Sequence, residues 1–118
     1  MSNAKRLTRI NEEIMREVSE IIRSEIKDPR VDTIITCTKA EITNDFKLCR
    51  LHVSIMGEES HKSEVVKGLN SSKGFIRKML AERINLRVTP ELYFEIDDSL
   101  DYGYKIDALL KRAAGNGA

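Results

Sequence analysis

The chain has 118 residues, of which 41% are hydrophobic and 33% charged, and its formal net charge is +1. This length suits one domain with one core, and the composition is that of a globular protein rather than a disordered one. No apolar run approaches the roughly 20 residues that a membrane-spanning helix needs, and the N-terminus lacks the apolar segment of a signal peptide. We therefore expect a cytoplasmic protein with no membrane partner.

The first predicted element is a long amphipathic helix over residues 7–27. Its apolar side chains follow the 3.6-residue helical period at Leu7, Ile10, Ile14, Val18, Ile21 and Ile26. The bases at its start oppose the helix dipole, which points to an anionic partner; they are Lys5, Arg6 and Arg9. Asp28-Pro29 should end the helix, because proline disfavours the helical conformation in the residue before it.

Two strands are predicted next, over residues 34–43 and 47–56, with a turn at Asn44-Asp45. The alternation of apolar residues breaks within the first strand, which indicates a β-bulge near Thr38-Lys39. In the second strand, Cys49, Leu51, Val53 and Ile55 point inward and His52 points outward. We interpret His52 as an exposed strand residue rather than a catalyst.

The two cysteines are expected to be buried free thiols. A turn at Asn44-Asp45 places Cys49 near Ala40 and Cys37 near His52, too far apart for a disulfide. The spacing of cysteines and histidines fits no metal site.

Two further helices are predicted, one ending near Ser71 and one over residues 73–84, with Ser60 or Ser63 as the N-cap of the first. One apolar stripe continues through both and places Phe75 toward the core. The segment Asn70-Ser71-Ser72-Lys73-Gly74 interrupts them with poor helix formers. This pattern predicts a bend between two helices that pack on the same core.

A third strand over residues 92–96 precedes a short last helix with Ile106, Leu109 and Leu110. The acidic residues Asp97, Asp98 and Asp101 lie at that junction, where helix capping explains them better than a cation site. The order helix, strand, strand, helix, helix, strand, helix predicts an α+β fold, with helices on one face of a three-stranded sheet.

Charge is segregated along the chain. Residues 61–90 hold seven bases and two acids, a net charge of +5, and residues 91–101 hold five acids and no base. A basic segment of this kind can bind a polyanion, although a solvated helix face has the same pattern.

Only 5% of residues are aromatic and none is Trp, which argues against a stacking platform for single strands. The motifs of common hydrolases, P-loops and dinucleotide sites are absent, so we expect no enzyme activity, no cofactor and no small-molecule substrate.

Six segments, in a specific order and spacing, resemble bacterial ribosome-binding factor A over about residues 6–110. They are Arg9-Ile10-Asn11-Glu12-Glu13-Ile14, Lys27-Asp28-Pro29-Arg30, Ile42-Thr43-Asn44-Asp45-Phe46, residues 69–77, residues 86–94 and Asp97-Asp98-Ser99-Leu100. The resemblance implies one KH-like domain of type II over residues 5–112, with flexible termini at 1–4 and 113–118. It also implies that a helix kink, commonly Ala-x-Gly and here Ser72-Lys73-Gly74, replaces the GxxG loop of KH domains. From the resemblance we expect the long basic C-terminal tail of some members to be short here.

The same resemblance implies a monomeric, non-enzymatic factor that binds the small (30S) ribosomal subunit and assists late maturation of its 16S rRNA, including during growth at low temperature. Phosphate contacts from Lys and Arg would supply affinity. The expected RNA-binding residues near the kink are Ser72, Lys73, Gly74, Arg77, Lys78, Arg83 and Arg87, followed by Lys5, Arg6, Arg9 and Arg30. The alternative is a protein–protein interaction module that uses the outer face or edge of the sheet.

Overall fold

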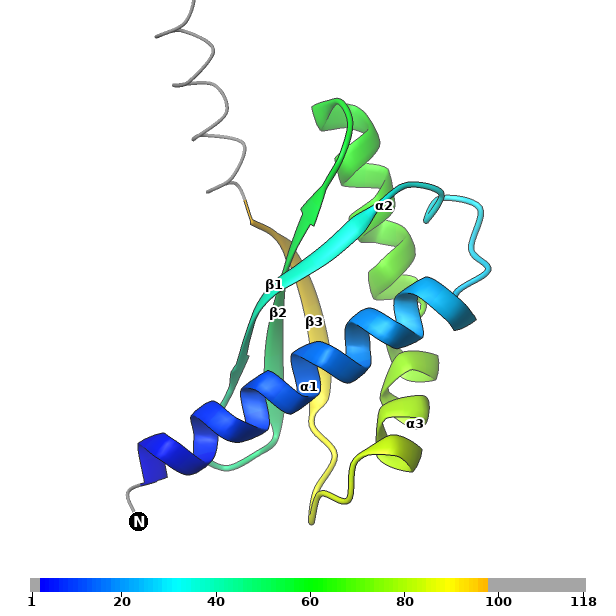
Figure 1. Ribbon diagram of the computed structural model, residues 1–118. Coiled ribbons are helices and arrows are strands. Elements are labelled where there is room, and N and C mark those ends of the chain that lie inside the picture. Colours follow the sequence, from blue (N-terminus) through cyan, green and yellow to red (C-terminus); the bar gives the residue numbers. More distant parts are fainter. Residues whose placement is uncertain (1–2, 98–118) are drawn as a thin grey trace, which may run out of the picture.

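The computed structural model describes residues 3–97 (Figure 1). Its elements are α1 (Asn3–Glu25), β1 (Ile35–Ile42), β2 (Leu48–Ile55), α2 (Glu59–Ser71), α3 (Lys73–Arg83) and β3 (Glu91–Ile96). The predicted order of elements is therefore confirmed through β3. The expected last helix lies outside the described residues.

Helix α1 begins four residues before the predicted start and ends two residues before the predicted end. Its end is set by a turn in which the Val31 amide donates to the Asp28 carbonyl at 2.9 Å. The Asp28 carboxylate accepts a second bond at 2.9 Å, from the Arg30 amide. Asp28 and Pro29 thus form a turn after the helix and not its last residues.

The sheet has the strand order β1-β2-β3, with β1 and β2 antiparallel and β2 and β3 parallel. The predicted bulge is confirmed, because the register shifts between Cys37 and Lys39. The predicted cysteine neighbours were wrong, since Cys37 lies opposite Val53 and Cys49 opposite Ile42. The cause is a longer turn, in which the Thr43 amide donates to the Leu48 carbonyl at 2.9 Å. Both cysteines are buried free thiols, as expected.

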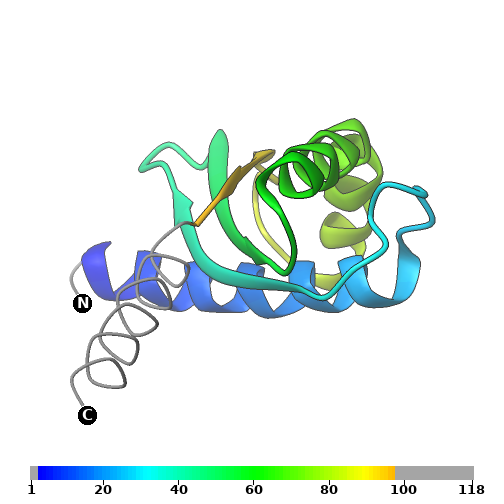
Figure 2. The same ribbon diagram turned by 90° about the horizontal axis from the view of Figure 1, so that it is seen from above.

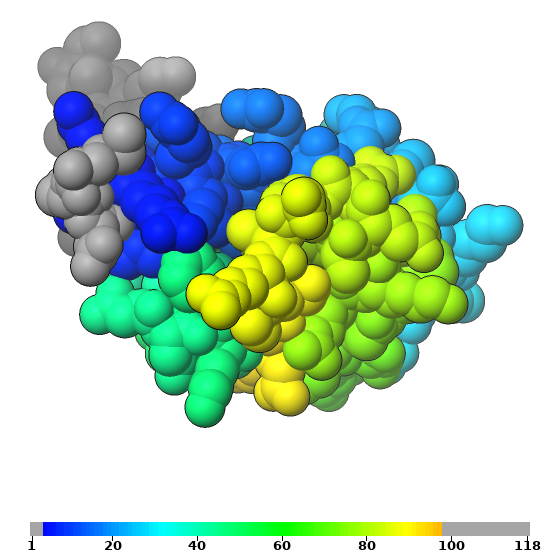
Figure 3. Space-filling view, turned by 90° about the horizontal axis from the view of Figure 1, so that it is seen from below, coloured from blue at the N-terminus to red at the C-terminus, as the bar shows by residue number. Residues whose placement is uncertain are grey.

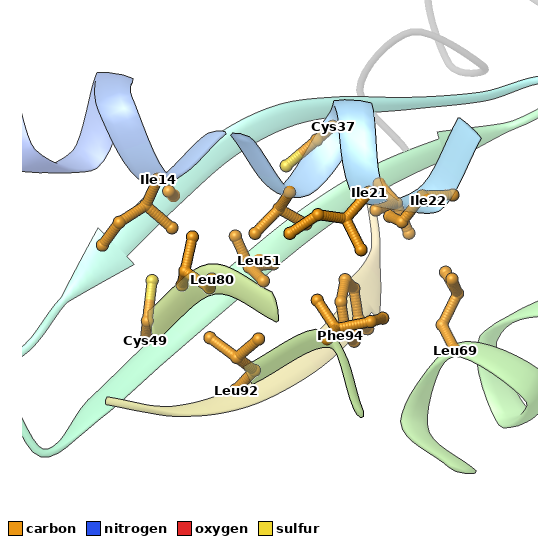
Figure 4. Packing of buried hydrophobic residues seen from close by; sticks show 14 of the residues in the cluster. Ile14, Ile21, Ile22, Cys37, Cys49, Leu51, Leu69, Leu80, Leu92 and Phe94 are labelled. Atoms are coloured by element: carbon orange, nitrogen blue, oxygen red, sulfur yellow. The ribbon is translucent and has the colours of Figure 1, made fainter. Parts of the chain in front are cut away.

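The helices lie on one face of the sheet, as predicted (Figure 2). Helix α1 packs on β1, α3 packs on α1 and β3, and α2 packs on β3. The inward residues of β2 and β3 are buried, and Ile14, Ile21, Leu69 and Leu80 of the helices meet them in one core (Figure 4). The opposite face of the sheet carries no helix among residues 3–97.

The break between α2 and α3 falls at Ser72, whose φ and ψ are −93° and 2°. Its amide is shared between the carbonyls of Gly68 and Leu69, at 3.1 and 3.0 Å, and its own carbonyl accepts from the Ile76 amide at 3.0 Å. The hydrogen-bond ladder therefore continues through the bend, and both helices stay on the core. The predicted bend is confirmed.

Two finer predictions were wrong, and a third was right only in part, because His52 points outward as predicted but its side chain is only 19% exposed. Phe75 is 46% exposed, because Ile76 and Leu80 occupy the buried stripe of α3 instead. The N-cap of α2 is Glu58, in an extended conformation, and neither predicted serine fills this position. His52 is half-buried on the open face of the sheet between two carboxylates.

Within residues 3–97 no helix combines the length and apolarity needed to cross a membrane.

Candidate nucleic-acid interface

The residues at the kink surround a shallow depression of about 270 Å³. Lys73, Gly74 and Arg77 of α3 line it together with Glu91 and Leu92 at the start of β3. Lys73 is exposed and has no ion pair or hydrogen bond from its side chain within the described part of the chain. The predicted kink residues are thus brought together beside the outer edge of β3.

Gly74 presents an open stretch of main chain at this depression. A Cβ atom placed on it would meet no other atom within 4 Å. The bend itself falls at Ser72, so the fold of the protein does not require a glycine at position 74. Because glycine has no Cβ atom, it allows a ligand to approach the main chain closely.

Arg77 is held by the connector between α3 and β3. Its Nε and Nη2 atoms donate hydrogen bonds to the Thr89 carbonyl, at 3.2 and 2.8 Å. This fixes the guanidinium beside the depression and leaves its Nη1 atom for another acceptor. Arg77 therefore positions the connector and still presents positive charge at the kink.

Two other predicted bases on α3 differ in their surroundings. Lys78 is exposed, and its side chain makes no ion pair or hydrogen bond among residues 3–97. Arg83 lies 3.5 Å from Glu17 and 3.9 Å from Glu25, both on α1. Arg83 thus joins α3 to α1, and its charge is largely compensated within the fold.

Arg30 lies beside the kink but is also engaged. Its Nε and Nη2 atoms donate to the two carboxylate oxygens of Asp28, at 3.0 and 2.8 Å, and Nη2 donates to Ser71 Oγ at 3.1 Å. The hydrogen bonds from Arg30 lower the pKa of Asp28 to about 2. Arg30 therefore fixes the loop after α1 against the end of α2.

The remaining predicted bases gather at the other end of the helical layer. Arg6 of α1 and Arg87 of the connector line one depression of about 560 Å³. The start of α1 (blue) and the connector (yellow) both adjoin the β1–β2 turn (green) in the space-filling view (Figure 3). Both are exposed, and neither has an ion-pair or hydrogen-bond partner in the described structure. Lys5 and Arg9 are exposed on the first turns of α1, and Lys5 has a partner.

The open face of the sheet carries charges that are mostly paired with one another. His52 Nε2 lies 2.7 Å from Glu41 and its Nδ1 lies 3.3 Å from Glu95. Arg50 lies 3.8 Å from Glu95, and Lys39 lies 3.6 Å from Glu41. The hydrogen bond from His52 lowers the pKa of Glu41. No group of metal-binding side chains occurs in the described residues.

The predicted site is thus two clusters, one at the kink and one at the start of α1, and Arg83 belongs to neither. Sequence reasoning missed the pairing of Asn70 with the main chain of Phe94, which holds the end of α2 on β3. An asparagine immediately before a helix break was the available signal.

The chain matches known proteins over most of its length. The family model of ribosome-binding factor A matches residues 6–110. The ribosome-binding factor A of Clostridium tetani is 43% identical over 111 residues, which cover 94% of this chain and 92% of that protein.

Solved structures agree with these matches. A solution structure from Thermotoga maritima, described as a candidate ribosome binding factor A, is 31% identical with a TM-score of 0.68, and the match covers 80% of this chain and 90% of that one. A homology model of the Thermus thermophilus ribosome binding factor A, fitted into a cryo-EM map of a 30S complex, is 21% identical with a TM-score of 0.61, over 75% of this chain and 91% of that one. The expected KH-like fold is therefore confirmed.

Proposed function

The chain belongs to the ribosome-binding factor A family, and from this premise we propose that it binds the small (30S) ribosomal subunit through 16S rRNA and assists late maturation of that RNA. The Thermus thermophilus family member is described in a complex with the 30S subunit. Membership of this family indicates the binding partner, and the distribution of unpaired cations indicates which surface of the chain contacts it.

The observation that carries the proposal is a difference among the predicted bases. Arg30 and Arg83 are held by carboxylates of the same chain, and Arg77 by a carbonyl. Among the predicted bases, those without a side-chain partner within residues 3–97 are Arg6, Arg9, Lys73, Lys78 and Arg87. An unpaired cation can neutralise a phosphate without first breaking an internal contact, so these five side chains are the best phosphate ligands.

We assign the roles accordingly. Lys73 and Lys78 contact phosphates at the kink, and Gly74 allows the RNA backbone to approach α3. Arg77 adds charge there while it holds the connector. Arg6, Arg9 and Arg87 form the second contact. The shape of the RNA then supplies selectivity.

Sedimentation with purified small subunits across a salt series tests this assignment. Binding should weaken steeply as salt rises, because phosphate contacts release counterions. In the double variant Lys73→Glu with Lys78→Glu, the slope of log affinity against log salt should decrease by about two, roughly one per lost contact. The matched control reverses two lysines elsewhere, Lys39 and Lys67, which are paired with Glu41 and Glu64.

A flat salt response would contradict the proposal and favour protein–protein binding through the open face of the sheet. The maturation role has its own readout. In a bacterium that lacks its family member, the wild-type chain should restore processing of 16S rRNA precursors, and the double variant should restore less. Equal restoration would contradict a role for Lys73 and Lys78.

A further inference from the structure

One depression on this molecule combines an apolar floor with a charged rim. It lies between the first turns of α1, the β1–β2 turn and the connector after α3, and we call it the hairpin pocket (Figure 3). Its volume is about 560 Å³, within the roughly 300–1,000 Å³ of typical small-ligand sites. The residues that line it are Arg6, Ile10, Glu13, Asp45, Phe46, Ile84, Asn85, Leu86, Arg87 and Val88.

The floor of the hairpin pocket is hydrophobic. Ile10, Phe46 and Leu86 are half-buried and pack against the core, and Ile84 is buried. Val88 stands at the rim and is 47% exposed. Binding of a flat, apolar group to such a surface is favourable, because it removes apolar area from water.

Phe46 reaches the pocket from a strained conformation. Its φ is 62°, in the left-handed region that a bulky side chain rarely adopts. The turn holds it there, because the Phe46 amide donates to the Thr43 carbonyl at 2.9 Å. The Asp45 carboxylate accepts from Thr43 Oγ1 at 2.6 Å and from the Lys47 amide at 3.1 Å. Strain maintained by such bonds often serves a binding site.

The rim combines positive charge with hydrogen-bonding groups. Arg6 and Arg87 are exposed and unpaired within the described residues, as noted above. Glu13 and Asn85 are exposed polar side chains of the same rim. Guanidinium groups bind phosphate oxygens, and carboxylate or amide groups can accept hydrogen bonds from the amino groups of a base.

Resting on the proposed function, we propose that the hairpin pocket receives one unpaired nucleobase of the bound RNA. The base lies against Phe46 and Leu86, its edge meets Glu13 and Asn85, and Arg6 and Arg87 hold the phosphates on either side. Unpaired bases that turn out of the helix are the usual targets of selective RNA recognition. The kink binds phosphates of paired RNA, whereas this pocket distinguishes an unpaired nucleotide.

Two RNA hairpins with the same stem test the proposal, one fully paired and one with a single bulged adenosine. In fluorescence anisotropy, the wild-type chain should bind the bulged RNA about tenfold more tightly, since stacking of a base on an aromatic ring supplies an effect of this size. Val88→Trp should fill the pocket from its exposed rim and abolish the preference. Ile34→Trp is the matched control, because Ile34 is 73% exposed at the opposite end of β1.

Phe46→Leu provides a second variant that keeps an apolar side chain in the turn and should also reduce the preference. Equal binding of both RNAs by the wild type, or a preference that survives in Val88→Trp and Phe46→Leu, would overturn the proposal. Competition by free adenosine monophosphate is a separate experiment. If it removes the preference at micromolar concentration, the pocket serves a free nucleotide and the RNA assignment is wrong. Salt-dependent binding of the paired hairpin would persist in each case, so failure here is distinct from failure of the proposed function.

Discussion

The side-chain amide of Asn70 pairs with both main-chain groups of Phe94. Its Nδ2 donates to the Phe94 carbonyl at 3.1 Å, and its Oδ1 accepts from the Phe94 amide at 3.0 Å. Asn70 thereby continues the hydrogen bonding of the sheet beyond the edge of β3, where no further strand lies in the described structure.

Replacement of this asparagine by alanine should lower the free energy of unfolding by about 1–3 kcal/mol, because the partly buried groups of Phe94 would lose their partners. Urea denaturation followed by circular dichroism measures the change. Asn85→Ala, at an exposed amide, should stay within about 0.5 kcal/mol of the wild type. Similar effects for the two variants would contradict the proposed importance of the pair.

The glycines on either side of Ser72 should respond oppositely to alanine. A Cβ at Gly68 would lie 2.9 Å from Val31 Cγ2 and 3.1 Å from Arg30 Cβ, so Gly68→Ala should cost about 1–3 kcal/mol through overpacking. Gly74→Ala meets open space and should add up to about 1 kcal/mol through helix propensity. Thermal unfolding compares them directly.

Gly74→Ala should also weaken binding to the small subunit, although it stabilises the chain. The methyl group would occupy the space where we propose that the RNA backbone approaches. A variant that is more stable and binds equally well would show that position 74 is not in the interface.

Acid should weaken the attachment of the loop after α1. The pKa of Asp28 is lowered from 3.8 to about 2 in the folded chain, mainly by its hydrogen bonds from Arg30. The unfolded chain therefore binds more protons in this range, and the free energy of unfolding falls as the pH falls from about 4 to about 2. Asp28→Asn and Arg30→Gln should each reduce this dependence in urea denaturation. An unchanged pH dependence in both variants would contradict the assignment.

The two cysteines should resist alkylation in the native protein. Burial raises the pKa of Cys37 to about 11 and that of Cys49 to about 12, so little reactive thiolate exists at pH 8. Reaction with iodoacetamide should therefore require unfolding, and both thiols should react in urea. Met56→Cys places a thiol where the side chain is 65% exposed and should react quickly in native conditions. Fast labelling of Cys37 or Cys49 in the native state would be inconsistent with this structure.

Periodicity predicted the elements well because each lies in one continuous segment. The apolar stripe of α1 and the alternation of β2 are local patterns, and the bulge at Thr38 appeared as a break in such a pattern. The placement of Phe75 failed for a related reason. A helix stripe is broader than the face that becomes buried, and packing against α1 and β3 selected Ile76 and Leu80 instead.

The sequence indicated which bases could belong to the candidate site, but not how they are arranged on the surface or which of them have internal partners. Sequence cannot show that Arg83 meets Glu17, 66 residues away, or that Arg77 meets the Thr89 carbonyl. The hairpin pocket was missed for the same reason, since Arg6, Phe46 and Arg87 come from three distant segments. Each of these relationships depends on tertiary contacts that no local pattern encodes.

The parallel pairing of β2 with β3 also has a kinetic consequence. Residues 56–90, with both helices and the bend, separate the two strands, whereas β1 and β2 adjoin through a short turn. Closing a long segment costs chain entropy before its contacts form. We therefore expect the β1–β2 hairpin to form early and β3 to join late, so that the edge beside the kink is completed only in the final stage of folding.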